Sequence, residues 1–232
     1  MVTLPLIDRN CYQGFEKVNS TGLVNNPGIA RISASTGVGG GTRWSQKTAD
    51  EILNDINSAI SALWRDNDCS IDALPNHILV PVEQFGALVT RKVSDDSERS
   101  ILSYVLENNL TTQQGGELII SPCKWCSRVG SSRSDRMVVY CNRIDRICFN
   151  LTQPLRRMET EYAEMRIKIP YIAQFSEVRF LYPSTAFTGV ADIALDTDAD
   201  DSEYVTLNVC GTMYVASCGT FFISCISSIP VA

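Results

Sequence analysis

The sequence predicts an α+β fold, in which several helices pack on a short sheet and antiparallel strands follow. Three observations predict it. Apolar residues recur at helical spacing between residues 43 and 109. Short alternating apolar runs separated by turn residues dominate from residue 117 onwards. Hydrophobic residues make up 44% of the 232 residues and charged residues 20%, a composition typical of a folded protein with a substantial core.

The clearest helix signal starts at Thr48. Thr48 is predicted to cap the helix, and Glu51 completes a capping box three residues later. The apolar face is predicted to contain Ile52, Ile56, Ala59, Ile60 and Leu63. The opposite, polar face is predicted to contain Asp50, Asn54, Asp55, Asn57 and Ser61. The polar run 66–68 ends this helix.

A buried strand and two further helices are predicted next. Residues 78–80 form an apolar run, and Pro81 suits the first turn of the following helix, where no amide donor is needed. The inner face of that helix is expected to contain Phe85, Leu88 and Val89. Ser97 or Asp95 is expected to cap a third helix, whose inner face contains Ile101, Leu102, Val105 and Leu106.

The remaining segments are predicted to be strands and connectors. Strands are expected at residues 29–32, 117–121, 137–141, 147–151 and 188–195, with two or three more within 204–229. Residues 166–170 and 177–182 are expected to pair with each other, and 154–164 to form a charged connector. Residues 37–41 are glycine-rich and predict a flexible connector. A phosphate-binding loop there is disfavoured, because no Gly-Lys-Ser/Thr follows.

The formal net charge of -6 argues against nucleic-acid binding through a basic surface. The sequence has no run of 18 apolar residues, so no membrane-spanning helix is expected. No export signal is evident, so synthesis in the cytosol and reduced thiols are expected. Seven of the nine cysteines are therefore interpreted as small apolar residues: Cys11, Cys69, Cys141, Cys148, Cys210, Cys218 and Cys225.

The sharpest chemical motif is Cys123-Lys-Trp-Cys126. Two thiols at this spacing can bind zinc or exchange disulfides. Zinc needs two further ligands, and the nearest cysteines do not repeat the spacing. A redox site would be followed by a helix, whereas a polar loop follows here. Incidental loop thiols therefore stay an open interpretation beside zinc and redox chemistry.

Two other groups contain residue types that can carry chemistry. Asp196, Asp198 and Asp200 alternate as in calcium loops, but the glycine and the distal glutamate of such loops are missing, so a solvated acidic turn is favoured. His77 is the only histidine and has no predicted carboxylate or nucleophile partner. The sequence therefore predicts no catalytic residues, no cofactor and no enzyme activity.

The middle of the chain is basic. It contains Arg128, Arg133, Arg136, Arg143, Arg146, Arg156 and Arg157. These residues indicate either a solvated face or a contact surface for an acidic neighbour, such as another copy of the chain.

A series of short motifs, taken in order and spacing, resembles the tailed-phage major capsid proteins that have the Hong Kong 97-type coat fold. The similarity extends from about residue 12 to 195. The motifs are 22–26 (GLVNN), Trp44 with Lys47-Thr48, Glu51-Ile52, 55–57 (DIN), 78–81 (ILVP), Gln84-Phe85, 93–95 (VSD), 100–102 (SIL), 135–140 (DRMVVY), Ile169-Pro170 and Tyr182-Pro183.

The resemblance implies a non-enzymatic virion subunit that assembles into the hexamers and pentamers of an icosahedral phage head. It implies a connector or peripheral segment at 1–45, an axial domain at 46–165 and returning peripheral strands at 166–195. Residues 196–232 do not align with the family and are expected to form a β-rich extension, whose edge could pair with a neighbour. Other copies of the chain are the expected partners.

The resemblance also implies that an amino-terminal arm, an extended loop and a long spine helix would precede residue 1. We therefore expect a major coat subunit that is a truncated copy or a minor variant, or the carboxy-terminal part of a split coat protein, with a separate amino-terminal fragment or other head proteins as further partners. A decoration or adaptor protein, or a thiol or zinc module using Cys123 and Cys126, are the alternatives.

Overall fold

A mixed five-stranded sheet lies at the centre of the molecule. The structure, a computed structural model, describes residues 3–15, 19–29, 31–94, 96–130, 133–163, 166–181, 190–193, 213–216, 220–223 and 227–230. The sheet contains β1 (Arg31–Ser33), β11 (Val190–Ile193), β4 (Asp135–Tyr140), β2 (His77–Val80) and β3 (Ile119–Pro122), in that spatial order. β2 is parallel to β3 and antiparallel to β4, while β1 is parallel to β11.

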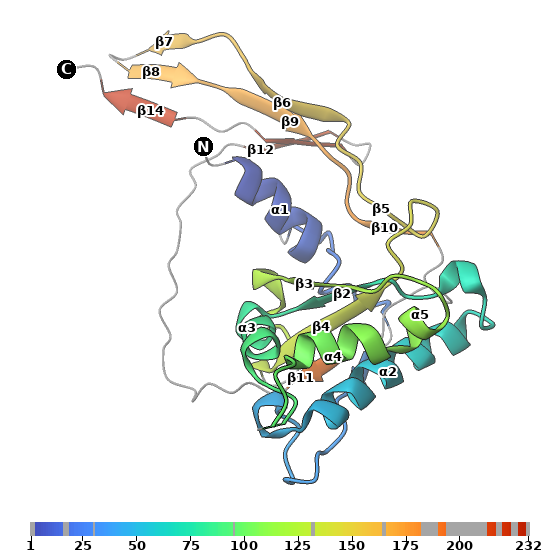
Figure 1. Cartoon of the computed structure of the whole chain (residues 1–232). Helices are drawn as coiled ribbons and strands as arrows, with labels where there is room; N and C mark the ends of the chain where they lie inside the picture. Colours follow the sequence, from blue (N-terminus) through green and yellow to red (C-terminus); the bar gives the residue numbers. More distant parts are fainter. Residues whose placement is uncertain are drawn as a thin grey trace.

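Helices cover one face of this sheet (Figure 1). They are α2 (Ala49–Asp66), α3 (Val82–Thr90), α4 (Ile101–Asn108) and the short α5 (Leu110–Gln113). Their inner side chains pack with Ile78 and Val80 of β2 and with Met137 and Val139 of β4. The predicted inner face of α2 is confirmed, because Ile52, Ile56, Ala59, Ile60 and Leu63 are all buried in this core.

The other face of the sheet is covered by the amino-terminal part of the chain. Leu79, Val138 and Tyr140 point to this side and pack with Leu23 and Val24. Helix α1 (Thr3–Gln13) contacts η4 (Lys124–Cys126), a 3-10 turn that follows β3. Every residue of β4 is buried, because both faces of this strand are covered.

The predicted helix boundaries hold where the signal is local. Thr48 and Glu51 form the predicted capping box: the Thr48 amide donates to Glu51 at 2.8 Å and the Glu51 amide to the Thr48 hydroxyl at 3.3 Å. Pro81 lies directly before the first residue of α3, one position earlier than predicted.

Two details of these helices were predicted wrongly. The cap of α4 is Ser100, which accepts from the Ser103 amide, and not Ser97; Asp95 lies outside the described residues. An antiparallel bridge to Lys92 keeps the backbone of Ser100 extended, so the helix begins only after this residue. Val89 is 45% exposed because it occupies the last turn of α3 and points away from the sheet.

We call the five-stranded sheet and its helices the body. A long ribbon of strands projects from this body (Figure 1). In the ribbon, β6 (Gln153–Arg157) pairs with β9 (Tyr171–Gln174), and β7 (Glu161–Ala163) pairs with β8 (Arg166–Ile169). At its base, β5 (Ile147–Cys148) pairs with β10 (Arg179–Phe180). Helix α1 lies between the body and the ribbon in this view.

The ribbon corrects two predictions. Most of the predicted connector 154–164 lies in strands, since 154–157 belong to β6 and 161–163 to β7. Residues 166–170 and 177–182 do not pair with each other. β8 and β9 are separated by Pro170 alone, and they pair with the preceding strands instead: β8 with β7 and β9 with β6. The alternation of these residues marks them as strands but does not specify their partners.

The last three strands belong to the predicted β-rich extension. β12 (Met213–Ala216) and β13 (Thr220–Ile223) form an antiparallel pair, and β13 contacts β9. β14 (Ser227–Pro230) pairs with β8 of the same chain. One edge of β14 is therefore used within the chain.

Candidate functional site

The thiol motif forms a turn directly after β3. The Cys126 amide donates to the Cys123 carbonyl at 3.2 Å, and the Cys123 amide donates to the Val80 carbonyl at 2.7 Å. Both side chains are buried in the core between the sheet and the amino-terminal segment. Trp125 connects the turn to α1, because its indole nitrogen donates to the Asp8 carboxylate at 3.1 Å. The turn is therefore a packed junction rather than an open site.

The electrostatics of this junction keep most of its thiols protonated. A hydrogen bond from Cys126 lowers the pKa of Cys123, while the same hydrogen bond, together with burial, raises the pKa of Cys126 far above the usual range. Burial and the nearby Asp8 carboxylate raise the pKa of Cys11 to about 11. Because thiolates are the reactive and metal-binding form, only Cys123 has any tendency toward that chemistry.

No group of three or more potential metal ligands comes together in the described part of the chain. Cys141 lies at the far end of β4, where its thiol contacts the Asp72 carbonyl, and Cys148 lies in β5. The calcium candidates Asp196, Asp198 and Asp200 lie outside the described residues.

His77 lies at the start of β2 between two amide side chains. Its Nδ1 is 3.2 Å from Asn76 Oδ1, and its Nε2 is 3.3 Å from Asn142 Nδ2. Burial lowers the pKa of His77. Neither ring nitrogen faces a carboxylate or a nucleophile in these contacts, so this arrangement positions the ring without activating it as a general base.

The predicted basic surface is divided among separate places. Arg136 is buried and donates to the Val24 carbonyl at 2.9 Å, which ties β4 to the amino-terminal segment. Arg143 donates to Asp72 at 2.8 Å on the surface of the body. Arg156 and Arg157 are exposed on β6 of the ribbon. These arginines therefore do not form one contact face.

The most connected polar cluster of the body was missed from the sequence. Asp55 was predicted on the outer face of α2 but is buried, and its carboxylate accepts from Lys47 Nζ at 2.5 Å, Trp44 Nε1 at 3.1 Å and Ser35 Oγ at 2.6 Å. The Lys47 side chain is 0% exposed and that of Asp55 2%. This cluster fastens the segment before α2 to the helix, and its role is structural.

Large apolar side chains are exposed in two regions. On the ribbon, Tyr162 is 79% exposed, and Leu155 and Met158 are also exposed. On the body, Ile144 is 86% exposed and Ile71 70%. Exposed apolar side chains that gather on one projecting element are typical of surfaces that contact other proteins.

Residues 5–189 match the family model described as "Major capsid protein". The chain belongs to the major capsid protein family. The resemblance found in the sequence is therefore confirmed at the level of the family. No curated protein matches the sequence.

The fold is similar to that of a chain in the solved capsid of Myoviridae phage XM1. The TM-score is 0.66 at 14% sequence identity, and the similarity covers 80% of this chain and 60% of that chain. The described residues contain no helix long and apolar enough to cross a membrane. The capsid protein is thus a mixed helix and strand protein that resembles a phage capsid structure.

Proposed function

We propose that the chain is a coat subunit of an icosahedral tailed-phage head and that it has the Hong Kong 97-type fold. Many copies would assemble into hexamers and pentamers, and the protein would reside in the virion head. The observation that carries this proposal is the match of residues 5–189 to the major capsid protein family. The likeness to a Myoviridae capsid chain supports it.

The domain division is part of this proposal. Residues 46–165 would form the axial domain around capsomer centres, residues 166–195 the peripheral strands, and residues 196–232 an extension. The body, with helices on one face of its sheet, is a suitable unit for the axial role, although two strands of its sheet, β1 and β11, come from outside residues 46–165. The predicted axial segment also includes β6 and β7, so part of the ribbon would reach from that domain toward neighbouring subunits.

A structural rather than an enzymatic role is supported by the chemistry of the polar groups. The thiol turn is buried under α1, and His77 contacts amides. Assembly instead requires surfaces that lose water on contact, and the exposed apolar residues of the ribbon provide such area.

A second candidate is a decoration or adaptor protein that binds a shell made by a larger coat protein. The chain spans 60% of the length of the matched capsid chain, which keeps this candidate in consideration. A separate capsid fragment would be the partner if the chain is one part of a split coat.

Purified phage particles and the isolated chain test the proposal together. Quantitative mass spectrometry should identify this chain as a dominant head protein, and electron microscopy should locate its fold in every capsomer position. A chain that is a monomer in solution and absent from particles would refute the proposal. Binding on the outside of a shell built by another protein would establish the second candidate.

A pair of surface variants tests the role of the ribbon. Tyr162→Ser should impair assembly without changing the melting temperature of the unassembled chain, because the side chain is 79% exposed. Val38→Ser is the matched control, since Val38 is 96% exposed in a loop of the body. Equal assembly of the two variants would remove the ribbon from the interface.

A further inference from the structure

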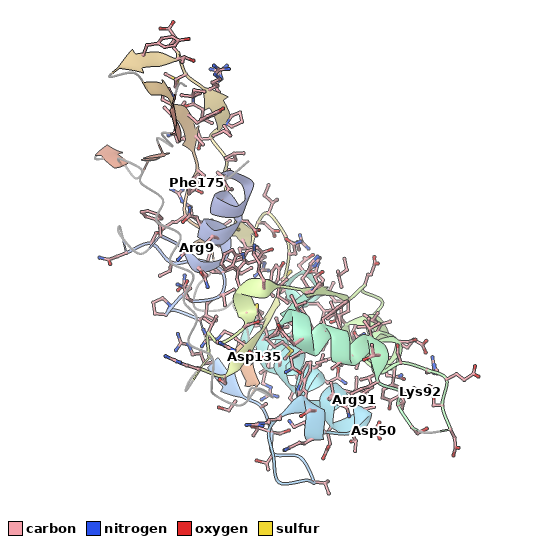
Figure 2. All side chains as sticks on the ribbon, turned by 90° about the vertical axis from the view of Figure 1, so that its left-hand side faces the viewer. Arg9, Asp50, Arg91, Lys92, Asp135 and Phe175 are labelled. Carbon is pink, nitrogen blue, oxygen red and sulfur yellow. The ribbon has the colours of Figure 1, made fainter. Side chains whose placement is uncertain are left out.

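A cavity of about 610 Å³ lies between the second half of α1 and the loop that follows it. Its lining includes Arg9, Asn10, Gln13, Ser20, Asn25 and Val129. The volume lies within the range of ordinary ligand sites. Figure 2 shows Arg9 on α1, at the side of the body nearer the ribbon and far from Asp50 and Arg91.

The hydrogen-bond acceptors at this end of α1 are already occupied. Its last four carbonyls all accept hydrogen bonds from nearby residues. The pairs are Gly14 to Asn10 at 2.9 Å, Leu23 to Cys11 at 3.0 Å, Val24 to Tyr12 at 2.9 Å, and the Asn25 amide to Gln13 at 2.6 Å. Asn25 Oδ1 accepts from the Gly22 amide at 2.7 Å. These carbonyls and Asn25 Oδ1 are therefore already engaged and are not free to accept hydrogen bonds from a ligand.

Two donors in the lining have no acceptor among the described residues. Asn10 is only 4% exposed, and its Nδ2 has no hydrogen-bond partner within the described chain. Buried side-chain amides are nearly always hydrogen-bonded, so this group needs an acceptor from outside. Arg9, the preceding residue, is exposed and forms no ion pair with any described acidic residue. A ligand of this cavity should therefore carry oxygen acceptors and negative charge.

We propose that this cavity binds an acidic polypeptide segment from a neighbouring copy of the chain, an inference that rests on the proposed coat function. The side-chain carboxylate of the segment would pair with the Arg9 guanidinium. A backbone carbonyl of the same segment would accept from Asn10 Nδ2. The exposed position of Arg9 on α1 leaves it accessible to a second subunit.

The charge of the protein favours a peptide over nucleic acid as the ligand. Nucleic acid is bound through many phosphate contacts, and a single arginine is a small basic footprint for it. Each copy of the chain, in contrast, carries a dense acidic run at residues 196–203 (DTDADDSE). In a shell of identical subunits, such a run is present at the same concentration as the cavity.

Fluorescence anisotropy on the unassembled full chain tests this binding. The probe is a labelled synthetic peptide of residues 195–204, with an analogue in which every Asp and Glu is replaced by its amide. The acidic peptide should bind, and the analogue should bind at least about tenfold more weakly, the scale of one charge-assisted hydrogen bond. Arg9→Gln and Asn10→Leu should each weaken binding, whereas Arg65→Gln, which removes an exposed charge at the end of α2, should not.

Three results would overturn the proposal. They are no measurable binding of the acidic peptide, equal weakening by Arg9→Gln and Arg65→Gln, and stronger binding of a single-stranded oligonucleotide than of the peptide. Circular dichroism of the Asn10→Leu variant controls for folding. If wild-type particles assemble normally while the peptide does not bind, this inference fails and the coat function stands.

Cross-linking in assembled particles gives a second readout. Arg9→Lys introduces an amine that a carbodiimide joins to a carboxylate in direct contact. Particles mixed from light and heavy isotope-labelled subunits should yield cross-links from position 9 to an acidic residue of another copy. Two outcomes would contradict an intersubunit ligand. The first is that Arg9→Lys gives cross-links only within one copy, and the second is that it gives no more cross-links than the control variant Arg65→Lys.

Discussion

Replacing Asp55 with alanine should destabilise the body more than the loss of an exposed ion pair or of a helix cap. The substitution removes the acceptor of three side chains, Lys47, Trp44 and Ser35, while leaving the lysine charge in place. The Lys47 side chain is 0% exposed, so water cannot replace the carboxylate without opening the structure. An uncompensated buried charge typically costs about 3–5 kcal/mol. That is a large share of the roughly 5–15 kcal/mol by which folded domains are stable.

A double-mutant cycle isolates the pair itself. Lys47→Met alone leaves Asp55 with the donors of Trp44 and Ser35, and the double variant Lys47→Met/Asp55→Ala leaves neither charge buried. The double variant should therefore be more stable than the sum of the single losses implies, with a coupling energy of about 0.5–3 kcal/mol. Urea unfolding followed by tryptophan fluorescence is a direct assay, because Trp44 contacts the carboxylate.

The exposed pair Arg99 and Glu107 provides the control. Both side chains are about half exposed, so Glu107→Ala should not shift the urea midpoint resolvably. The reasoning is refuted if Asp55→Ala costs less than about 1 kcal/mol, well below the range for breaking a buried pair, or if its loss equals that of the exposed control.

A helix cap, a histidine and the thiols each provide a further test. Ser100→Ala should destabilise the chain by about 1 kcal/mol because it removes the cap of α4, whereas Ser97→Ala should cost only a few tenths in thermal unfolding. Burial lowers the pKa of His77 below its ordinary value of 6.5, so stability should be fully present above pH 6.5 and fall as the pH drops below it. His77→Gln should flatten that part of the stability profile. Thiol labelling of the native chain should modify the exposed Cys69 before the buried Cys126, and early modification of Cys126 would contradict the packed turn.

The parts of the fold that could be predicted from the sequence depend on local signals. The capping box of α2 and its apolar face lie within one segment, so spacing alone reveals them. Asp55 was assigned to the wrong face of α2 because a charged residue was expected to face solvent. It follows Ile52 by three residues and precedes Ala59 by four, and this spacing indicates the inner face. Lys47, the residue before the Thr48 cap, is the buried partner of Asp55, and its position next to the helix was the available indication of this ion pair.

Pairing between distant strands could not be predicted in the same way. The alternation in residues 166–170 is equally compatible with several partners, and the structure pairs β8 with β7 and β14. The cavity beside α1 was also invisible to sequence reasoning. Its defining property is that Asn10 is buried without a partner, and burial of a polar residue depends on how the loop after α1 folds back.

The insertion of β11 into the sheet has a consequence for the order in which the protein folds during synthesis. β1 hydrogen-bonds to β11, and β11 lies between β1 and β4. Residues 31–33 therefore wait for residues 190–193 to leave the ribosome before they gain a partner in the sheet. Contacts separated by this much chain form late and slowly. The helices and the β2, β3 and β4 strands can form earlier. Completion of the sheet by β1 and β11 is therefore a late folding step, which occurs only after the ribbon has been synthesised.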